Sequence, residues 1–323
     1  MQRLVSPWLA IHGEAALPRL FKVVPAASRI VQVFAISTPS SFHLLRLCLN
    51  KSDIDYQSLM IIAATSGQVD SIRQLQASYP DRVAIHESAA LAVAAANGHL
   101  QTVKYLHAYC PNPLGADALV NAAAGGHLEI VKFLHTHRGD DDWSTDVVDA
   151  AAASGHVEVV QFLHTSRTQG CTISGLQMAT IRGHLDVVRW IHVHRNDLWR
   201  ASDVIEKAAQ GGHLAILQYV LDTSPNVSCT TYAMDLAATH GHLEIVQFLH
   251  AHRTDGCTEV AMQGATSNGH DHVVAYLVVH GPELIHSLCG VCGFYKLRNH
   301  YCAVYERAIA RKPQRMRACT EQL

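Results

Sequence analysis

Residues 237–252 read AATHGHLEIVQFLHAH, and this stretch decides the fold. It holds a pair of small residues, a Gly-His dipeptide, and then apolar residues at the second, fifth and eighth positions after the glycine. That spacing places the apolar side chains on one face of an α-helix. Glycine adopts a positive φ at little cost, so Gly241 predicts a tight turn between a first helix and a second helix.

The same pattern returns along the chain every 28 to 31 residues. The Gly-His dipeptide occurs at Gly98, Gly126, Gly155, Gly183, Gly212, Gly241 and Gly269, and Gly67-Gln68 is an altered earlier copy. A fixed period of this length is the sequence signature of a repeat protein. One helix pair cannot bury both its faces, so the copies must stack. The sequence therefore predicts an all-α helix-turn-helix solenoid of about eight repeats with short linkers.

The core is predicted by three apolar positions counted from each turn glycine. The seventh residue before the glycine is apolar in all eight copies: Met60, Leu91, Leu119, Val148, Leu176, Ile205, Met234 and Met262. The fifth residue after it is Ile72, Val103, Val131, Val160, Val188, Leu217, Val246 or Val274. The eighth is Leu75, Leu106, Leu134, Leu163, Ile191, Val220, Leu249 or Leu277. The seventh residue after the glycine is aromatic in all copies but the first. Lysine and arginine are not interleaved with these aromatic residues, as they would be in a surface that stacks nucleic-acid bases. The pattern therefore predicts a ladder of aromatic side chains packed between second helices.

The linkers are short and carry hydroxyl residues where the next first helix should begin. Thr258 is expected to be an N-cap, and Thr145, Thr172, Ser202 and Thr230 lie near the same place in other copies. A side-chain oxygen at this position can accept a hydrogen bond from a free backbone N–H of the first turn. We therefore expect each first helix to start close to these residues.

The bulk composition excludes several classes of function. The chain has 323 residues, of which 49% are apolar and 16% charged, and a formal net charge of -2. Such a balance gives no basic field for nucleic acid or anionic membranes. No apolar run is long enough to span a membrane, and nine scattered cysteines fit a reducing compartment. We expect a cytoplasmic monomer. Without a nucleophile elbow, phosphate loop or metalloprotease motif, we expect no enzyme and no cofactor.

The repeat resembles the ankyrin repeat, whose core reads AAxxGHLEVVKLLL, over about residues 58–280. Two departures stand out. The ankyrin TPLH tetrapeptide is missing, and the period is four or five residues short of the usual 33. The shortfall lies in the linker that would form the protruding hairpin finger, as in the short, finger-poor repeats of large protist and oomycete ankyrin families. The resemblance implies a scaffold that binds another protein.

The resemblance also suggests which face would bind. With reduced fingers, the contact area shifts to the concave face made by the first helices, where ankyrin repeats present the residues just before the glycine. The sixth, second and last positions before the glycine hold mostly polar residues. The share of polar residues at these positions increases from the fifth copy onward. The candidate partner-binding residues are Asp149, Gln177, Arg182, Glu206, Gln210, Asp235, His240, Gln263 and Asn268. Each could equally be an ordinary solvated position.

The 23 histidines are not expected to bind metal. In the three His-x-His motifs, residues two apart on a helix point away from each other and cannot close on one ion. These motifs are His135–His137, His192–His194 and His250–His252. The histidines of the Gly-His turns are expected to bond to backbone, as the ankyrin pattern also implies. Burial disfavours their charged form, so stability should fall below neutral pH.

The two ends of the chain depart from the period. Residues 1–52 are read as a degenerate N-terminal capping repeat or as a targeting segment, residues 53–280 as the array, and residues 281–323 as a C-terminal cap or a partner-specific tail. The tail contains Cys289, Cys292, His300 and Cys302, which could form a small zinc module. An alternative function follows: the array could be the substrate-recognition adaptor of a regulatory complex such as a ubiquitin ligase, with the tail recruiting the machinery.

Overall fold

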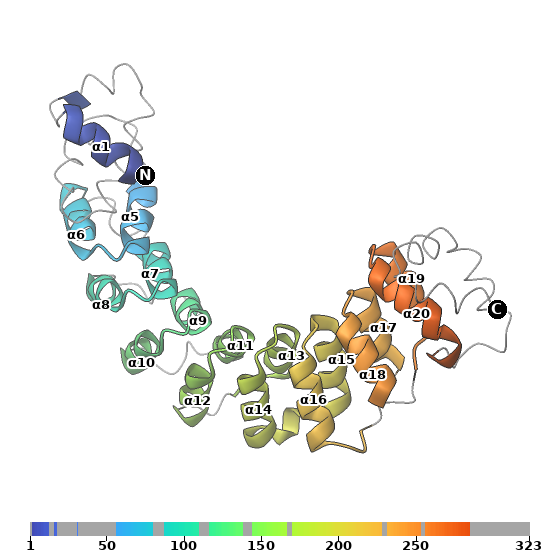
Figure 1. Ribbon diagram of the computed structural model, residues 1–323. Coiled ribbons are helices and arrows are strands. Elements are labelled where there is room, and N and C mark those ends of the chain that lie inside the picture. Colours follow the sequence, from blue (N-terminus) through green and yellow to red (C-terminus); the bar gives the residue numbers. More distant parts are fainter. Residues whose placement is uncertain are drawn as a thin grey trace. The chain divides into compact units, whose positions relative to one another are not determined.

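The computed structural model describes residues 2–12, 16–17, 31, 56–79, 87–109, 116–137, 144–166, 170–227, 231–252 and 256–284 (Figure 1). Most of the predicted N-terminal segment and nearly all of the predicted C-terminal tail, including Cys289, Cys292, His300 and Cys302, lie outside these residues. The chain divides into two compact units, Met1–Gly170 (unit 1) and Cys171–Leu323 (unit 2). The division falls inside the predicted array.

Unit 1 contains helix α1 (Gln2–His12) and four helix pairs. Its first helices are α5 (Tyr56–Thr65), α7 (Glu87–Ala96), α9 (Ala116–Ala124) and α11 (Thr145–Ala153). Its second helices are α6 (Val69–Ser78), α8 (Leu100–Tyr109), α10 (Leu128–His137) and α12 (Val157–Ser166). Neighbouring first helices pack side by side, and each second helix packs on its own first helix.

Unit 2 repeats this arrangement. Its first helices are α13 (Ile173–Ile181), α15 (Ala201–Gly211), α17 (Thr231–Thr239) and α19 (Glu259–Ser267). Its second helices are α14 (Leu185–His194), α16 (Leu214–Thr223), α18 (Leu243–His252) and α20 (Asp271–Leu284). Figure 1 shows α13, α15 and α17 in one row and α14, α16 and α18 in a second row. Each unit is thus two layers of helices, which confirms the predicted all-α solenoid.

The predicted core positions are buried in both units. The apolar residue seven places before each turn glycine is at most 4% exposed, and the fifth residue after the glycine is 0% exposed in every copy. The alanine pairs between them are also buried, as Ala237 and Ala238 illustrate at 0%. Small side chains let neighbouring first helices approach closely, so the pattern that defines the period also builds the core.

Each turn ends the first helix with a glycine in the left-handed conformation. The eight turn glycines have φ between 69° and 85°. At Gly241, the glycine N–H donates to the carbonyl of Ala238 at 3.1 Å and the His242 N–H donates to that of Ala237 at 2.9 Å. These two bonds form a Schellman motif, which satisfies carbonyls left free at a helix end. The predicted turn is confirmed.

The histidine after the turn glycine joins one repeat to the repeat before it. In five copies its Nε2 donates to the carbonyl of the residue two places before the preceding turn glycine. The pairs are His99–Thr65 (2.8 Å), His127–Ala96 (3.0 Å), His156–Ala124 (3.0 Å), His213–Ile181 (2.7 Å) and His242–Gln210 (3.1 Å). The expected bond to backbone is confirmed in these copies, and it connects different repeats.

The aromatic residues seven places after the glycines lie half-buried between second helices. In four copies, this aromatic residue contacts a histidine of the preceding second helix. His107 meets Phe133 edge-on with centroids 5.4 Å apart, and His135 meets Phe162 in the same way at 5.5 Å. His192 Nδ1 is hydrogen-bonded to the Tyr219 hydroxyl at 2.8 Å, and His250 Nδ1 to that of Tyr276 at 2.6 Å. The predicted packing ladder is confirmed, with histidine as its second member.

The expected N-caps are present in some copies and displaced in others. The Thr258 hydroxyl accepts from the Val260 N–H and the Thr172 hydroxyl from the Ser174 N–H, both at 3.1 Å. Thr145 is the first residue of α11 and Ser202 the second residue of α15, and the N-caps of these helices are Ser144 and Arg200. Thr230 lies outside the described residues. The linker before α15 contains a single 3-10 turn, Asn196–Leu198, in place of a hairpin finger.

Candidate functional site

The candidate site is the face of unit 2 made by the first helices α13, α15, α17 and α19. Neighbouring helices of this set pack directly against each other. Arg182, His240, Gln263 and Asn268 are exposed on it, and Gln177, Glu206 and Gln210 are half-buried. Asp149 is half-buried at the equivalent position of α11 in unit 1. Asp149, Gln177, Glu206 and Gln263 lie six places before their turn glycine, Gln210 lies two places before it, and Arg182, His240 and Asn268 lie directly before it. The sixth and second positions are four residues apart and therefore share a helix face.

Asp235 differs from the other candidate residues, and its predicted role needs correction. It is 4% exposed. Its carboxylate accepts hydrogen bonds from the Thr258 N–H and from the Thr258 hydroxyl, both at 2.7 Å. Thr258 is the N-cap of α19, so Asp235 on α17 fastens the start of the next first helix. The side chain is occupied inside the fold and is unavailable to a partner on this face.

The surroundings of Asp235 also affect a neighbouring cysteine. Burial raises the pKa of the Asp235 carboxyl, although the hydrogen bonds from Thr258 lower it. Burial, with a smaller effect of the nearby Asp235 charge, raises the pKa of the Cys257 thiol to about 12. A thiol is a nucleophile only as the thiolate. Cys257 is therefore an inert residue of the core at neutral pH.

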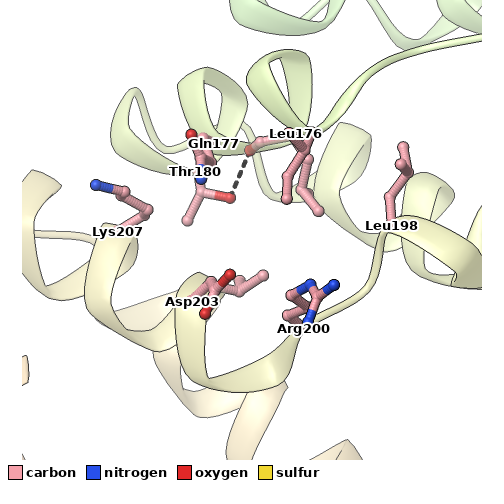
Figure 2. A pocket seen from close by; sticks show the side chains of 9 residues that line it. Leu176, Gln177, Thr180, Leu198, Arg200, Asp203 and Lys207 are labelled. Carbon is pink, nitrogen blue, oxygen red and sulfur yellow. Dashed lines mark hydrogen bonds between the residues drawn. The ribbon is translucent and has the colours of Figure 1, made fainter. Parts of the chain in front are cut away.

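The groove between α13 and α15 is lined by charged side chains that the sequence analysis missed. Figure 2 shows Gln177 and Thr180 of α13 across from Asp203 and Lys207 of α15, with Arg200 at the start of α15. Lys207 Nζ donates to Gln210 Oε1 at 3.4 Å. The missed residues lie nine, five and twelve places before Gly212. A wider search at helical spacing would have found Asp203, which shares a face with Glu206 and Gln210, and Lys207, which shares one with Asp203 and Gln210.

This groove is too small to hold a ligand. The pocket in Figure 2 has a volume of about 10 Å³. Roughly 10–15 Å³ is the space that one water molecule needs. The charged side chains around it are therefore features of a surface rather than of a small-molecule site.

At the other end of the face, between α17 and α19, two side chains are fixed by hydrogen bonds. His240 Nδ1 donates to the Leu236 carbonyl at 2.9 Å, and its ring is stacked parallel to that of His242 with centroids 6.3 Å apart. Asn268 Nδ2 donates to the Thr239 carbonyl of the preceding repeat at 2.9 Å. Fixed side chains lose less rotamer entropy when a partner binds.

Exposed apolar side chains border the same end of the face. Tyr232 on α17 and Val260 on α19 are each 53% exposed, and both lie nine places before their turn glycine. Neither residue was predicted from the sequence, because only the polar positions of the repeat were considered. Tyrosine is among the residues that contribute most to protein–protein interfaces.

No group of three or more His, Cys, Asp or Glu side chains in the described part of the chain could hold a metal ion. Two members of the His-x-His motifs illustrate how these rings are engaged instead. His192 is bonded to Tyr219, while the His194 Nδ1 donates to the Trp190 carbonyl at 2.9 Å. Within the described residues, no helix has both the length and the apolar character that crossing a bilayer requires.

Comparison with known proteins gives one family. The model for ankyrin repeats in three copies matches residues 59–146 and 91–174, and the model for ankyrin repeats in many copies matches residues 205–250. The first matches lie mainly in unit 1 and the last in unit 2. A search of curated proteins gives no match.

Proposed function

Because this chain belongs to the ankyrin repeat proteins, which are generally protein–protein interaction modules and typically non-enzymatic scaffolds, we propose that it binds a partner protein through the first-helix face of unit 2. The proposed contact residues are Gln177, Arg182, Glu206, Gln210, His240, Gln263 and Asn268, and Asp149 is their counterpart in unit 1. Asp235 is left out because it is buried.

The observation that carries the proposal is the repetition of accessible side chains across packed neighbouring helices. Helices in contact lie about 8–10 Å apart, so equivalent residues form a row at that spacing. A row of this kind can follow an extended surface of another protein. A concave cavity for a small ligand is not found at the groove between α13 and α15, where about 10 Å³ is open.

The composition of the face supports a protein as the ligand. Tyrosine and arginine are enriched among the few residues that carry most of the binding energy of an interface, and Tyr232 and Arg182 provide one of each. The charged side chains on α15 include both signs, namely Asp203, Glu206 and Lys207. A mixed surface favours a partner chosen by local complementarity over a polyanion such as nucleic acid.

The test is an affinity purification with the full chain as bait. Arg182→Glu and His240→Glu reverse or add charge on the first-helix face, and Tyr232→Ala removes the exposed ring. Each should reduce recovery of a partner that the unmodified chain enriches, because like charges or a lost anchor typically cost at least tenfold in affinity.

Two variants on the second helices serve as matched controls. Arg189→Glu on α14 and Gln247→Glu on α18 make the same changes of charge at exposed positions. They should leave recovery unchanged. Partner recovery that survives all three first-helix variants, or that falls equally in the controls, would show that the first-helix face is not the binding surface.

A further inference from the structure

A shallow depression lies between α16 and α18, in the layer of second helices. Its volume is about 430 Å³, which is within the range of about 300–1,000 Å³ typical of binding pockets. The lining residues are Gln218, Leu221 and Asp222 of α16, Pro225 of the following turn, and Phe248 and His252 of α18. None of them belongs to the first-helix face.

The depression lies where the repeat pattern is broken. The ninth residue after the turn glycine is a histidine in five copies, and in four of these it contacts the aromatic residue of the next second helix. In α16 that position is Leu221. The next aromatic residue, Phe248, therefore has no histidine opposite it on the preceding second helix, and the histidine that it contacts, His252, is on its own helix α18.

The lining of the depression contains one carboxylate and no lysine or arginine. Asp222 is exposed, and it is the only acidic residue ten places after a turn glycine; the other copies have alanine, threonine or valine there. Neither Leu214–Thr223 nor Leu243–His252 contains lysine or arginine. Within the described residues, the formal charge of these two helices is therefore entirely negative.

The remaining lining groups are the Gln218 amide, the rings of Phe248 and His252, and the apolar side chains of Leu221 and Pro225. His252 Nδ1 donates to the Phe248 carbonyl at 2.9 Å, so in the neutral imidazole Nε2 is an acceptor. The His252 ring stacks on Phe248 with centroids 4.2 Å apart. Gln218 adds an amide oxygen. Leu221 and Pro225 provide apolar surface beside these groups.

We propose that this depression receives a lysine or arginine side chain from a basic segment of a partner protein. The methylene groups of such a side chain pack on Leu221, Pro225 and the Phe248 ring. Its cationic end lies beside the Asp222 carboxylate, where charge attraction and the ring face both stabilise it. The depression shares no residue with the first-helix face, so either site can bind a partner when the other does not.

The experiment is an NMR titration of the full, isotopically labelled chain. The probe is N-acetyl-arginine-methylamide, and the matched neutral probe is the citrulline derivative of the same shape. The arginine derivative should give saturable shifts of the backbone signals of Thr223 and His252, with a Kd on the order of millimolar, because a single side chain supplies few contacts. The citrulline derivative should bind at least about threefold more weakly, as expected when an exposed ion pair is lost.

Variants locate the charge that matters. Asp222→Asn should weaken arginine binding about threefold, whereas Glu244→Gln, which removes an exposed carboxylate from the first turn of α18, should leave it unchanged. Backbone spectra of both variants are compared with that of the unmodified chain to verify folding. The proposal is overturned if the arginine derivative gives no saturable shifts, if citrulline binds equally well, or if Asp222→Asn and Glu244→Gln behave alike. The outcome does not depend on Arg182 or His240, so it is distinct from the test of the first-helix face.

Discussion

His242 lies against Gly212 of the preceding repeat, and the contact needs both residues. The imidazole Nε2 donates to the Gln210 carbonyl at 3.1 Å. A Cβ added to Gly212 would lie 2.7 Å from Nδ1 and Cε1 of the same ring, which is closer than real side chains approach. Gly212 also has φ of 84°, a conformation that other residues adopt at a cost. Glycine is therefore required at this turn for two separate reasons.

Gly212→Ala should destabilise unit 2 by about 2–4 kcal/mol. Roughly 1–2 kcal/mol comes from the positive φ and the rest from displacement of the His242 ring. Urea unfolding followed by tryptophan fluorescence measures the change, with Trp190 and Trp199 of unit 2 contributing alongside Trp8 and Trp143. Stacked repeats can unfold in stages, so the midpoint is the quantity to compare.

Gly269→Ala is the matched control for this effect. Gly269 has a similar φ of 74°, but a Cβ there meets no atom within 4 Å in the part of the chain that the structure describes. Gly269→Ala should therefore destabilise the fold only by the cost of a positive φ in alanine, about 1–2 kcal/mol. Equal costs for the two variants would contradict a role for the histidine contact.

Asp235→Ala should destabilise the α17–α19 pair by about 2–3 kcal/mol. The change leaves the Thr258 N–H and hydroxyl without the carboxylate that accepts from both at 2.7 Å. Gln263→Ala, at the equivalent but exposed position of α19, should change stability by less than about 0.5 kcal/mol. Thermal unfolding of the two variants compares them directly, and an equally small effect at Asp235 would be inconsistent with its capping role.

Stability should fall between about pH 7 and about pH 5.5. Burial lowers the pKa of His242 below its ordinary value, with smaller contributions from the charges of His240, His213 and His270, although the hydrogen bond to Gln210 raises it. Burial also lowers the pKa of His192. The unfolded chain then binds more protons than the native chain below about pH 6.5, so unfolding becomes more favourable as the pH falls.

The urea midpoint at each pH measures this effect. His242→Gln retains a donor for the Gln210 carbonyl but cannot be charged, so the pH dependence of its midpoint should be shallower than that of the unmodified chain. A midpoint that is the same at both pH values would rule out the proposed linkage. If the pH dependence of the urea midpoint is unaltered in His242→Gln, titratable groups other than His242 are responsible for it.

Tyr219→Phe should cost about 1 kcal/mol. The substitution removes the hydroxyl that is hydrogen-bonded to His192 Nδ1 at 2.8 Å while keeping the ring between α14 and α16. A double-mutant cycle with His192→Ala should give a coupling of about 0.5–1 kcal/mol. Tyr232→Phe, at a tyrosine that is 53% exposed, should be close to neutral. A coupling near zero would mean that the ladder contact adds nothing beyond ring packing.

The amino-acid sequence alone determined the architecture of each repeat. Met234, Val246 and Leu249 could be assigned to the core because their spacing from Gly241 matches the period of a helix, and a helix pair can bury its apolar face only against a neighbour. The turn itself was equally predictable. It depends on residues adjacent in sequence, and glycine has the conformational freedom that the left-handed φ requires.

Only the tertiary structure decided which polar side chains are accessible and where a depression lies between two second helices. Asp235 and Gln263 occupy the same place in the period, yet Asp235 is buried because its partner Thr258 comes from the next repeat. The depression at Asp222 is likewise made by two helices from different repeats, with Leu221 and Asp222 from α16 and Phe248 and His252 from α18. Local spacing fixes the direction of a side chain along its own helix, but what that side chain meets is set by a neighbour about 23 to 32 residues away.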